Sequence, residues 1–205
     1  MQSMQMPVLT IIAGCNGAGK STFAPSFLPE GLLSFDYDKL FLEHYNQLPD
    51  SELREELARN KTTEEFERAV NIALTNMTDF CYETNFDVNP LYWAEIFKKN
   101  SYTINLIFFC LKNQTIAKHR IQVCTEFKGH FVNNYTIAFK WKAGYKNLNA
   151  HYSFFDNILI VDNSKQGDVY TNLLQIKKRK LIVMTDRLPD YFSHRFPDIY
   201  QLVIN

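Results

Sequence analysis

The stretch 14–22, with the sequence GCNGAGKST, constrains this chain more than any other. It matches the phosphate-binding pattern G-x-x-x-x-G-K-[ST] at every fixed position. The apolar, β-branched run 8–13 precedes it and predicts a buried strand, and the residues after Lys20 are compatible with a helix. A chance match in a chain of this length has odds of about one in a hundred, and the flanking elements lower them. The sequence therefore predicts a P-loop protein that binds a nucleoside triphosphate.

The residue types of this loop explain the prediction. Glycines allow positive φ and let successive backbone N–H groups point at one anion, while the start of the next helix adds partial positive charge. We therefore expect the loop to bind ATP, with Lys20 on the β- and γ-phosphates and the Ser21 hydroxyl as a ligand of Mg²⁺. The predicted nucleotide-binding residues are Gly14, Asn16, Gly17, Ala18, Gly19, Lys20, Ser21 and Thr22.

Composition narrows the class of protein. Lys and Arg together number 22, as do Asp and Glu, so the zero formal charge gives no general attraction to nucleic acid or to an anionic membrane. The four cysteines, of which Cys15 lies inside the loop, form no C-x-x-C pair and are expected to be reduced thiols of a cytoplasmic protein. Oxidation of Cys15 would block the nucleotide site, which is a side hypothesis. The length of 205 residues suits a single P-loop kinase domain, 1–205.

Apolar runs and helical spacing alternate along the chain. Strands are expected at 8–13, 32–35, 80–82, 103–111, 158–161 and 181–184. Helices are expected at 39–47, 51–77, 91–99 and 169–177, and over 113–148 with an interruption at 129–130 and a new helix start at 132–133. Alternation of this kind predicts an α/β fold with a parallel sheet of about five or six strands flanked by helices. The segment 112–146 is rich in Lys and Arg and is expected to form a basic helical lid over the site.

Polar residues follow several of the expected strands. They include Asn16, Asp36 and Asp38, Glu83 and Thr84, and Asp162 and Asn163. Because ligands bind beyond the carboxyl ends of parallel strands, these side chains are expected to meet around the loop. Asp38 and Glu83 are the carboxylates that suit phosphoryl transfer, which needs a positioned acceptor and charge compensation. The alternative for Asp38 is a helix N-cap, and for Glu83 a solvated strand end.

An ordered set of segments resembles the zeta toxin family of P-loop kinases over residues 8–164. The segments are 11–24, FDYDKL at 35–40, YETN at 82–85, Arg120-Ile121, GHFV at 129–132, KNL at 146–148 and DNS at 162–164. The resemblance implies transfer of the ATP γ-phosphate to UDP-N-acetylglucosamine, and a small helical antitoxin as protein partner.

The resemblance also implies roles for single residues. The implied catalytic residues are Lys20, Asp38 as the base, and Arg120. The implied substrate-binding residues are Asp38, Glu83, Thr84 and Lys140, and Asn163 is expected to shape the adenine end. Several positions depart from the family pattern: Cys124 and Lys140 stand where Arg is frequent, Lys128 replaces Gly, and Asn85 replaces Thr. Lys140 keeps the charge without the bidentate geometry of Arg, whereas Cys124 supplies no charge.

Two other interpretations stay open at this point. One is a nucleotide-binding but catalytically impaired relative that acts through a protein partner, which the changes at Cys124 and Asn85 favour. The other is a P-loop kinase with a different small-molecule acceptor, since the acceptor pocket is not fixed by the fold. GTPase specificity is not expected, because the sequence has no Asn-Lys-x-Asp element. Residues 165–205 lie outside the resemblance and form a C-terminal extension of unknown role.

Overall fold

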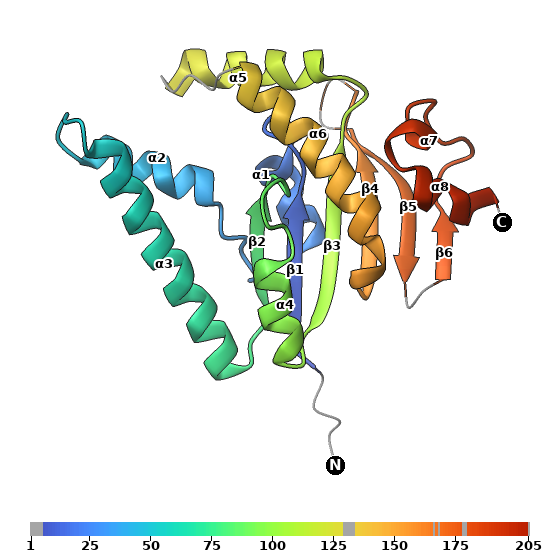
Figure 1. The fold of residues 1–205 in the computed structure, drawn as a ribbon, viewed down its shortest axis with the longest axis horizontal. Coiled ribbons are helices and arrows are strands. Elements are labelled where there is room, and N and C mark those ends of the chain that lie inside the picture. Colours follow the sequence, from blue (N-terminus) through green and yellow to red (C-terminus); the bar gives the residue numbers. More distant parts are fainter. Residues whose placement is uncertain (1–5, 129–133, 166, 168, 178–179, 205) are drawn as a thin grey trace.

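The computed structural model describes residues 6–128, 134–165, 167, 169–177 and 180–204. Within this part of the chain lies one six-stranded sheet with the order β2-β1-β3-β4-β5-β6 (Figure 1). Its strands are β1 (Val8–Ala13), β2 (Phe80–Thr84), β3 (Thr103–Cys110), β4 (Asn157–Asp162), β5 (Thr171–Lys177) and β6 (Lys180–Val183). The first four strands are parallel to one another, and β5 and β6 each run antiparallel to the preceding strand. The α/β fold predicted from the sequence is confirmed.

Helices cover both faces of the sheet. They are α1 (Lys20–Phe23), α2 (Tyr37–Gln47), α3 (Arg54–Asn76), α4 (Tyr92–Lys99), α5 (Gln114–Lys128), α6 (Asn134–His151), α7 (Phe192–Arg195) and α8 (Pro197–Ile204). Phe109 of β3 stacks on Phe23 of α1, whereas its neighbour Phe108 packs against Tyr145 of α6. Because successive strand residues point to opposite faces, α1 and α6 lie on opposite sides of the sheet. Helices α2 and α3 form a pair that projects from the β2 edge, and α5 crosses the carboxyl ends of the strands (Figure 1).

Two expected elements are different in the structure. The run 32–35 forms no strand, and only Phe35 makes a parallel bridge, to Tyr82 of β2. Leu33 is 82% exposed, and the pairing with β2 is confined to Phe35, whose amide donates to the Cys81 carbonyl oxygen and whose carbonyl accepts from the Glu83 amide. The segment 169–177 was expected to be a helix and is instead β5. Its adjacent residues Leu173 and Leu174 are both buried, which a strand covered on both faces allows and a one-sided helix does not.

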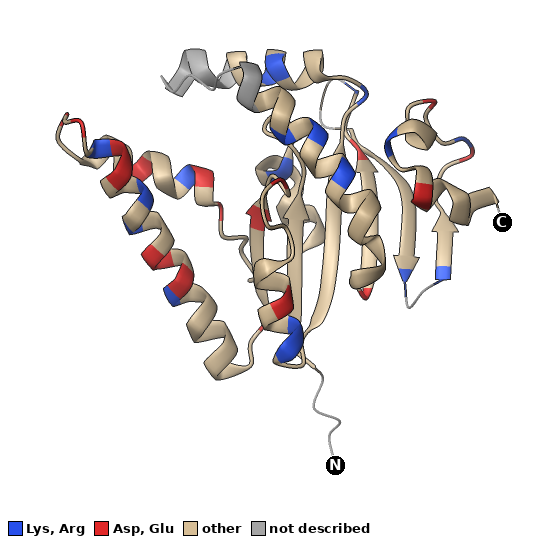
Figure 2. Cartoon of the chain, in the orientation of Figure 1, with Lys and Arg blue, Asp and Glu red and all other residues tan. Residues whose placement is uncertain are grey.

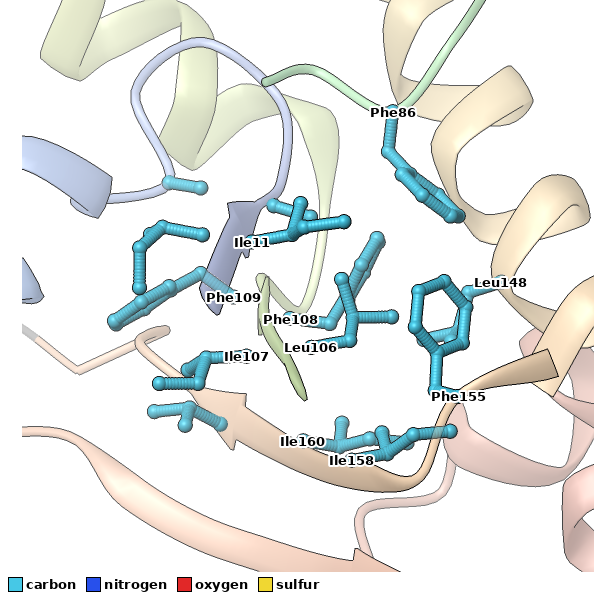
Figure 3. Close-up of a cluster of buried hydrophobic side chains, with 14 of the residues drawn as sticks. Ile11, Phe86, Leu106, Ile107, Phe108, Phe109, Leu148, Phe155, Ile158 and Ile160 are labelled. Carbon is cyan, nitrogen blue, oxygen red and sulfur yellow. The ribbon is translucent and has the colours of Figure 1, made fainter. Parts of the chain in front are cut away.

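One cluster of buried side chains joins the whole sheet to its helices and runs from Leu9 to Ile199. Figure 3 shows the part of it above β3 and β4, where Phe86, Phe108 and Phe155 lie together. The ring of Phe86 lies 6.5 Å from that of Phe108 and 6.0 Å from that of Phe155. Phe86 belongs to the loop after β2, so this loop is held by the core. In the described part of the chain, none of the helices has the length and apolar character needed to cross a bilayer.

The charged side chains are spread over the outer helices. Figure 2 shows acidic and basic residues interspersed along α2 and α3, and several basic residues along α5 and α6. The basic residues of α6 include Lys140, Lys142 and Lys146. The basic character expected for the segment 112–146 therefore falls on the two helices beside the carboxyl ends of the strands. Its function as a lid stays a prediction.

Candidate active site

The glycine loop follows β1 directly and is compressed between two other elements. Gly17 and Gly19 have φ values of 78° and 93°, in the region that favours glycine. A Cβ on Gly17 would lie 2.7 Å from the Ala117 carbonyl oxygen of α5, and one on Gly19 would lie 2.2 Å from Asn163 Nδ2. Neither position has room for a side chain. The loop conformation is therefore set by α5 on one side and by the residues after β4 on the other.

The ammonium group of Lys20 lies inside the loop. Its Nζ donates to the carbonyl oxygen of Gly14 at 2.9 Å and to that of Cys15 at 3.4 Å. It also reaches Asn85 Oδ1 at 3.4 Å, in the segment after β2. The predicted phosphate-binding lysine is thus placed at the mouth of the loop, next to the loop that follows β2.

Two carboxylates converge on the hydroxyl group of Ser21, the second residue of α1. Its Oγ lies 2.8 Å from Asp36 Oδ2 and 2.7 Å from Glu83 Oε2. The other oxygen of each carboxylate is fixed by the protein: Asp36 Oδ1 accepts from the Lys39 amide at 3.0 Å, and Glu83 Oε1 accepts from Ser34 Oγ at 2.9 Å. Each carboxylate therefore turns one oxygen toward Ser21.

This arrangement has one proton for two acceptors. A hydroxyl group can donate to only one carboxylate at a time, so Asp36 and Glu83 repel each other unless positive charge lies between them. Glu83 is 8% exposed, and burial, followed by the charge of Asp36, raises its pKa above the ordinary value. Two carboxylate oxygens and a hydroxyl oxygen are ligands that Mg²⁺ prefers. Ser21, Asp36 and Glu83 therefore fit a magnesium ion.

Asp36, which was expected at this rim without a role of its own, thus contacts Ser21 directly. Sequence reasoning assigned the chemistry to Asp38, although Asp36 also follows the apolar run 32–35. Asp36 is the N-cap of α2, whereas Asp38 lies in the first turn of that helix. The N-cap role considered for Asp38 is therefore filled by its neighbour. The role of Asp38 as a base stays a prediction.

Arg120 and Asn163 both contact the glycine loop. Arg120 Nη1 lies 3.4 Å from the Gly17 carbonyl oxygen, and its Nη2 donates to the Lys165 carbonyl at 2.9 Å. Partial burial lowers the pKa of the Arg120 guanidinium. Asn163 is 2% exposed and donates through Nδ2 to the Ala18 carbonyl at 2.8 Å. The side chain of Asn163 therefore binds the backbone of the glycine loop, and a contact between Asn163 and adenine stays a prediction.

The remaining expected site residues lie further from this cluster or are less constrained. Thr84 Oγ1 accepts from the Phe86 amide at 3.0 Å and shapes the turn after β2. Thr22 is exposed on α1, and Lys140 lies on α6. Their roles stay predictions, as does the effect of Cys124, whose side chain lies outside the described part. The Gly-His segment at 129–130 also lies outside the described residues.

Cys15 is buried in the loop and is 5% exposed. Burial raises the pKa of its thiol to about 11, although nearby Lys20 acts in the opposite direction. The thiol is therefore protonated near neutral pH, which disfavours the hypothesis of regulation by oxidation at this residue. Cys15, Cys81 and Cys110 are free thiols, as the spacing of the cysteines predicted.

Solved structures with the same arrangement of elements come from several systems. A chain of the AvrRxo1-ORF1:AvrRxo1-ORF2 complex with sulphate ions has a TM-score of 0.64 at 10% identity, covering 98% of this chain and 64% of that one. A structure of the same pair with ATP gives 0.60 at 8% identity and equal coverage. A chain from the PezAT chromosomal toxin-antitoxin system of Streptococcus pneumoniae gives 0.60 at 13%, covering 100% and 90%. A chain of the Pnkp1/Rnl/Hen1 RNA repair complex gives 0.54 at 20%, covering 92% and 52%.

These likenesses establish the type of fold. The mostly parallel sheet flanked by helices resembles the fold of the chain from the PezAT toxin-antitoxin system. Because the sequence identities are 20% or less, these likenesses show the fold and do not establish an activity. This chain spans about half the length of the RNA repair chain, at 52%, and 64% of the AvrRxo1 chain. By sequence, neither a known protein family nor a curated protein matches this chain.

Proposed function

We propose that this protein is a kinase that transfers the γ-phosphate of ATP to a hydroxyl group of a small molecule. The observation that carries the proposal is the hydroxyl of Ser21, held between the carboxylates of Asp36 and Glu83 directly after a glycine loop. A structural turn would not need two buried or half-buried carboxylates beside one serine, because their mutual repulsion costs stability. A site for a metal-bound triphosphate explains them.

The proposed division of roles follows the contacts. The backbone N–H groups of the loop and Lys20 hold the β- and γ-phosphates, and Lys20 exchanges its loop carbonyls for phosphate oxygens. Arg120, beside Gly17, compensates the charge that develops on the transferred group. Ser21, Asp36 and Glu83 would hold Mg²⁺, which would neutralise charge on the phosphates. Asp38, at the start of α2, accepts the proton of the acceptor hydroxyl.

For the acceptor we propose a nucleotide sugar such as UDP-N-acetylglucosamine, which the sequence resemblance implies. The end of β2 with the segment that follows it, and the α2–α3 pair, are the proposed walls of its site, since Glu83 and Thr84 close β2 and Asp38 lies in α2. We also propose a small antitoxin as partner. The PezAT chain comes from a toxin-antitoxin system, and the AvrRxo1 chain comes from a complex of two proteins. Both observations support the proposal of a protein partner for this chain.

The direct test is to incubate the protein with Mg-ATP and UDP-N-acetylglucosamine and to measure the mass of the sugar nucleotide. The expected product is heavier by one phosphate. Asp38→Asn is expected to lower kcat by on the order of 10²- to 10⁴-fold, because it removes a general base, while the affinity for ATP is unchanged. Asp36→Asn is expected to raise the Mg²⁺ concentration needed for half-maximal rate.

The matched control is Asp50→Asn, since the side chain of Asp50 is 97% exposed and lies outside the site. Unchanged kinetics are expected for this variant. The proposed acceptor is wrong if no phosphorylated sugar nucleotide forms while another metabolite in a cell extract gains a phosphate. The proposed reaction itself is wrong if ATP binds and no compound in the extract is phosphorylated.

The last outcome would favour the impaired relative that acts through a partner. One contact supports keeping this second candidate: the Lys20 ammonium reaches Asn85, which stands where the zeta toxins have Thr. An amide oxygen that holds Lys20 away from the phosphates would weaken transfer more than binding. In Asn85→Thr, restored turnover with unchanged affinity for ATP would identify that cause.

A further inference from the structure

Arg195 of α7 binds the backbone at the point where β3 ends and the chain turns toward α5. Its Nη1 donates to the Leu111 carbonyl oxygen and its Nη2 to the Lys112 carbonyl oxygen. These carbonyls belong to consecutive residues, so the planar guanidinium holds both with parallel donors, which a lysine cannot do. A residue near the C-terminus thus fixes the residues that lead into α5.

Three aromatic rings surround the same guanidinium. Its Cζ lies 4.3 Å from the ring centroid of Tyr191, 4.8 Å from that of Trp141 and 4.9 Å from that of Tyr145. Rings at these distances attract a cation and restrict its rotamers. The side chain is therefore fixed in position between α6 and α7.

The residues that lead into α5 are held by two further side chains. The Tyr145 hydroxyl accepts from the Leu111 amide at 2.9 Å and lies 3.2 Å from the Leu111 carbonyl oxygen. The Lys112 amide donates to Ser164 Oγ at 2.6 Å. Elements from three places in the sequence, α6, α7 and the end of β4, thus converge on residues 111–112, which we call the α5 root.

The position of the α5 root matters because α5 lies against the glycine loop. The carbonyl oxygen of Ala117 approaches Gly17 so closely that a Cβ there would lie 2.7 Å away. Arg120, on the same helix, reaches the Gly17 carbonyl oxygen at 3.4 Å. A shift of α5 at its root would therefore change both the shape of the loop and the position of Arg120.

We propose that Arg195 is a positioning residue for the nucleotide site, and that it acts through the α5 root on Arg120. The proposal rests on the proposed function for its kinetic test only. It gives a defined structural role to the C-terminal segment, which the family resemblance does not cover. In this role Arg195 of α7 holds residues 111–112 in place and thereby keeps α5 against the glycine loop.

The first experiment needs no catalysis. Hydrogen–deuterium exchange of the free full-length protein is compared for wild type, Arg195→Met and Arg187→Met. Arg187 belongs to the same segment and pairs locally with exposed Asp190 at 2.9 Å, so Arg187→Met is a matched loss of charge. We expect amides 111–122 to exchange at least several-fold faster in Arg195→Met and at the wild-type rate in Arg187→Met. Equal rates in both variants would overturn the proposal whether or not the protein is a kinase.

The second experiment separates positioning from general stability through a double-mutant cycle. If Arg195 acts through Arg120, then Arg120→Met combined with Arg195→Met lowers kcat no further than Arg120→Met alone. The KM for ATP is expected to change less than kcat in both single variants. Multiplicative losses in the double variant would show that Arg195 acts by another route and would overturn the proposal.

A milder variant covers the case in which Arg195→Met does not fold. Arg195→Lys keeps the charge between the rings and loses the two parallel donors. We expect it to fold and to show faster exchange at the α5 root, with a smaller loss of kcat. Wild-type exchange and wild-type kcat in Arg195→Lys would contradict a role for the paired donors.

Discussion

At the scale of single residues, the group formed by Ser21, Asp36 and Glu83 carries an electrostatic cost in the free protein. Glu83 is buried and faces a second carboxylate, and only one hydroxyl proton lies between them. Proteins retain such repulsion where it serves a ligand, because an amide in place of the acid would give a more stable free protein. The repulsion between Asp36 and Glu83 thus destabilises the free protein, and a bound cation would relieve it.

Glu83→Gln is therefore expected to stabilise the metal-free protein near neutral pH. Since the pKa of Glu83 is raised, the folded protein holds this proton more tightly than the unfolded chain, and the free energy of unfolding falls as pH rises above the ordinary value of 4.5. The variant should flatten this pH dependence and should lose the increase in Tm that Mg²⁺ gives the wild type. Thermal unfolding across the acid to neutral range, with and without Mg²⁺, measures both effects.

Glu56→Gln is the control for this prediction, because Glu56 is exposed on α3. It should keep the wild-type pH dependence and the wild-type response to Mg²⁺. The prediction is contradicted if Glu83→Gln is less stable than wild type without metal. In that case the hydrogen bond that the carboxylate accepts from Ser34 stabilises the protein more than repulsion from Asp36 destabilises it.

The sequence predicted part of this site because a glycine loop fixes the geometry of its own residues. Lys20 and Ser21 lie where the pattern requires, since the loop and the first turn of α1 are local structure. The choice between Asp36 and Asp38 depends on where α2 begins. That start is set by a side-chain cap and by the packing of Phe35 on Phe66, neither of which a local pattern specifies.

At the scale of elements, the loop after β2 is held in place by α6. Asn147 donates to the carbonyl oxygens of Phe86 at 2.9 Å and of Asp87 at 2.7 Å. Phe86 has a φ of 59°, an uncommon conformation for a residue with a side chain, and its ring is fully buried. The proposed acceptor loop is therefore held in a strained conformation by hydrogen bonds from one side and by core packing from the other.

Asn147→Ala is expected to destabilise the protein by about 1–3 kcal/mol, because two carbonyl oxygens lose a half-buried donor. It should also raise the KM for the acceptor more than the KM for ATP, since the loop borders the proposed acceptor site. Urea unfolding and steady-state kinetics measure the two effects. Asn149→Ala, on the same helix and bonded to Asp198 instead, should leave the KM for the acceptor unchanged. An equal rise in both variants would contradict the proposed role of the loop.

The element that sequence reasoning missed shows the limit of periodicity. The segment 169–177 satisfies helical spacing, yet it pairs with β4 because the sheet has an open edge there. Short apolar segments carry a weak local preference, and the available partner decides between helix and strand. The longer elements, such as α3 and β3, were predictable because their patterns extend over many residues.

At the scale of the whole molecule, the C-terminal segment is part of the core. Six of its large side chains are buried: Leu173, Leu174, Ile176, Phe192, Phe196 and Ile199. Each such side chain contributes about 1.5–3 kcal/mol on burial. Together the six side chains contribute about 9 kcal/mol or more to the free energy of unfolding, which is comparable to the total stability of many domains.

A chain that ends at Ser164 is therefore expected not to fold, although it contains every segment that resembles the zeta toxins. Soluble yield, circular dichroism and cooperative unfolding measure this outcome. A truncated protein that unfolds cooperatively and binds ATP with wild-type affinity would show that 165–204 is an addition to a self-sufficient fold, and would contradict the prediction.

The order of the strands in space differs from their order in the chain, and this has a consequence for biosynthesis. The glycine loop is synthesised well before Arg195, which follows it in the chain. Before β5 and α7 are synthesised, the nascent chain would have a β4 edge without its neighbouring strand and an α5 helix without its contact to Arg195. If Arg195 positions α5 as proposed, the nucleotide site would gain its working shape only after the residues that follow β4 had been synthesised, and a neutralising partner could bind during that interval.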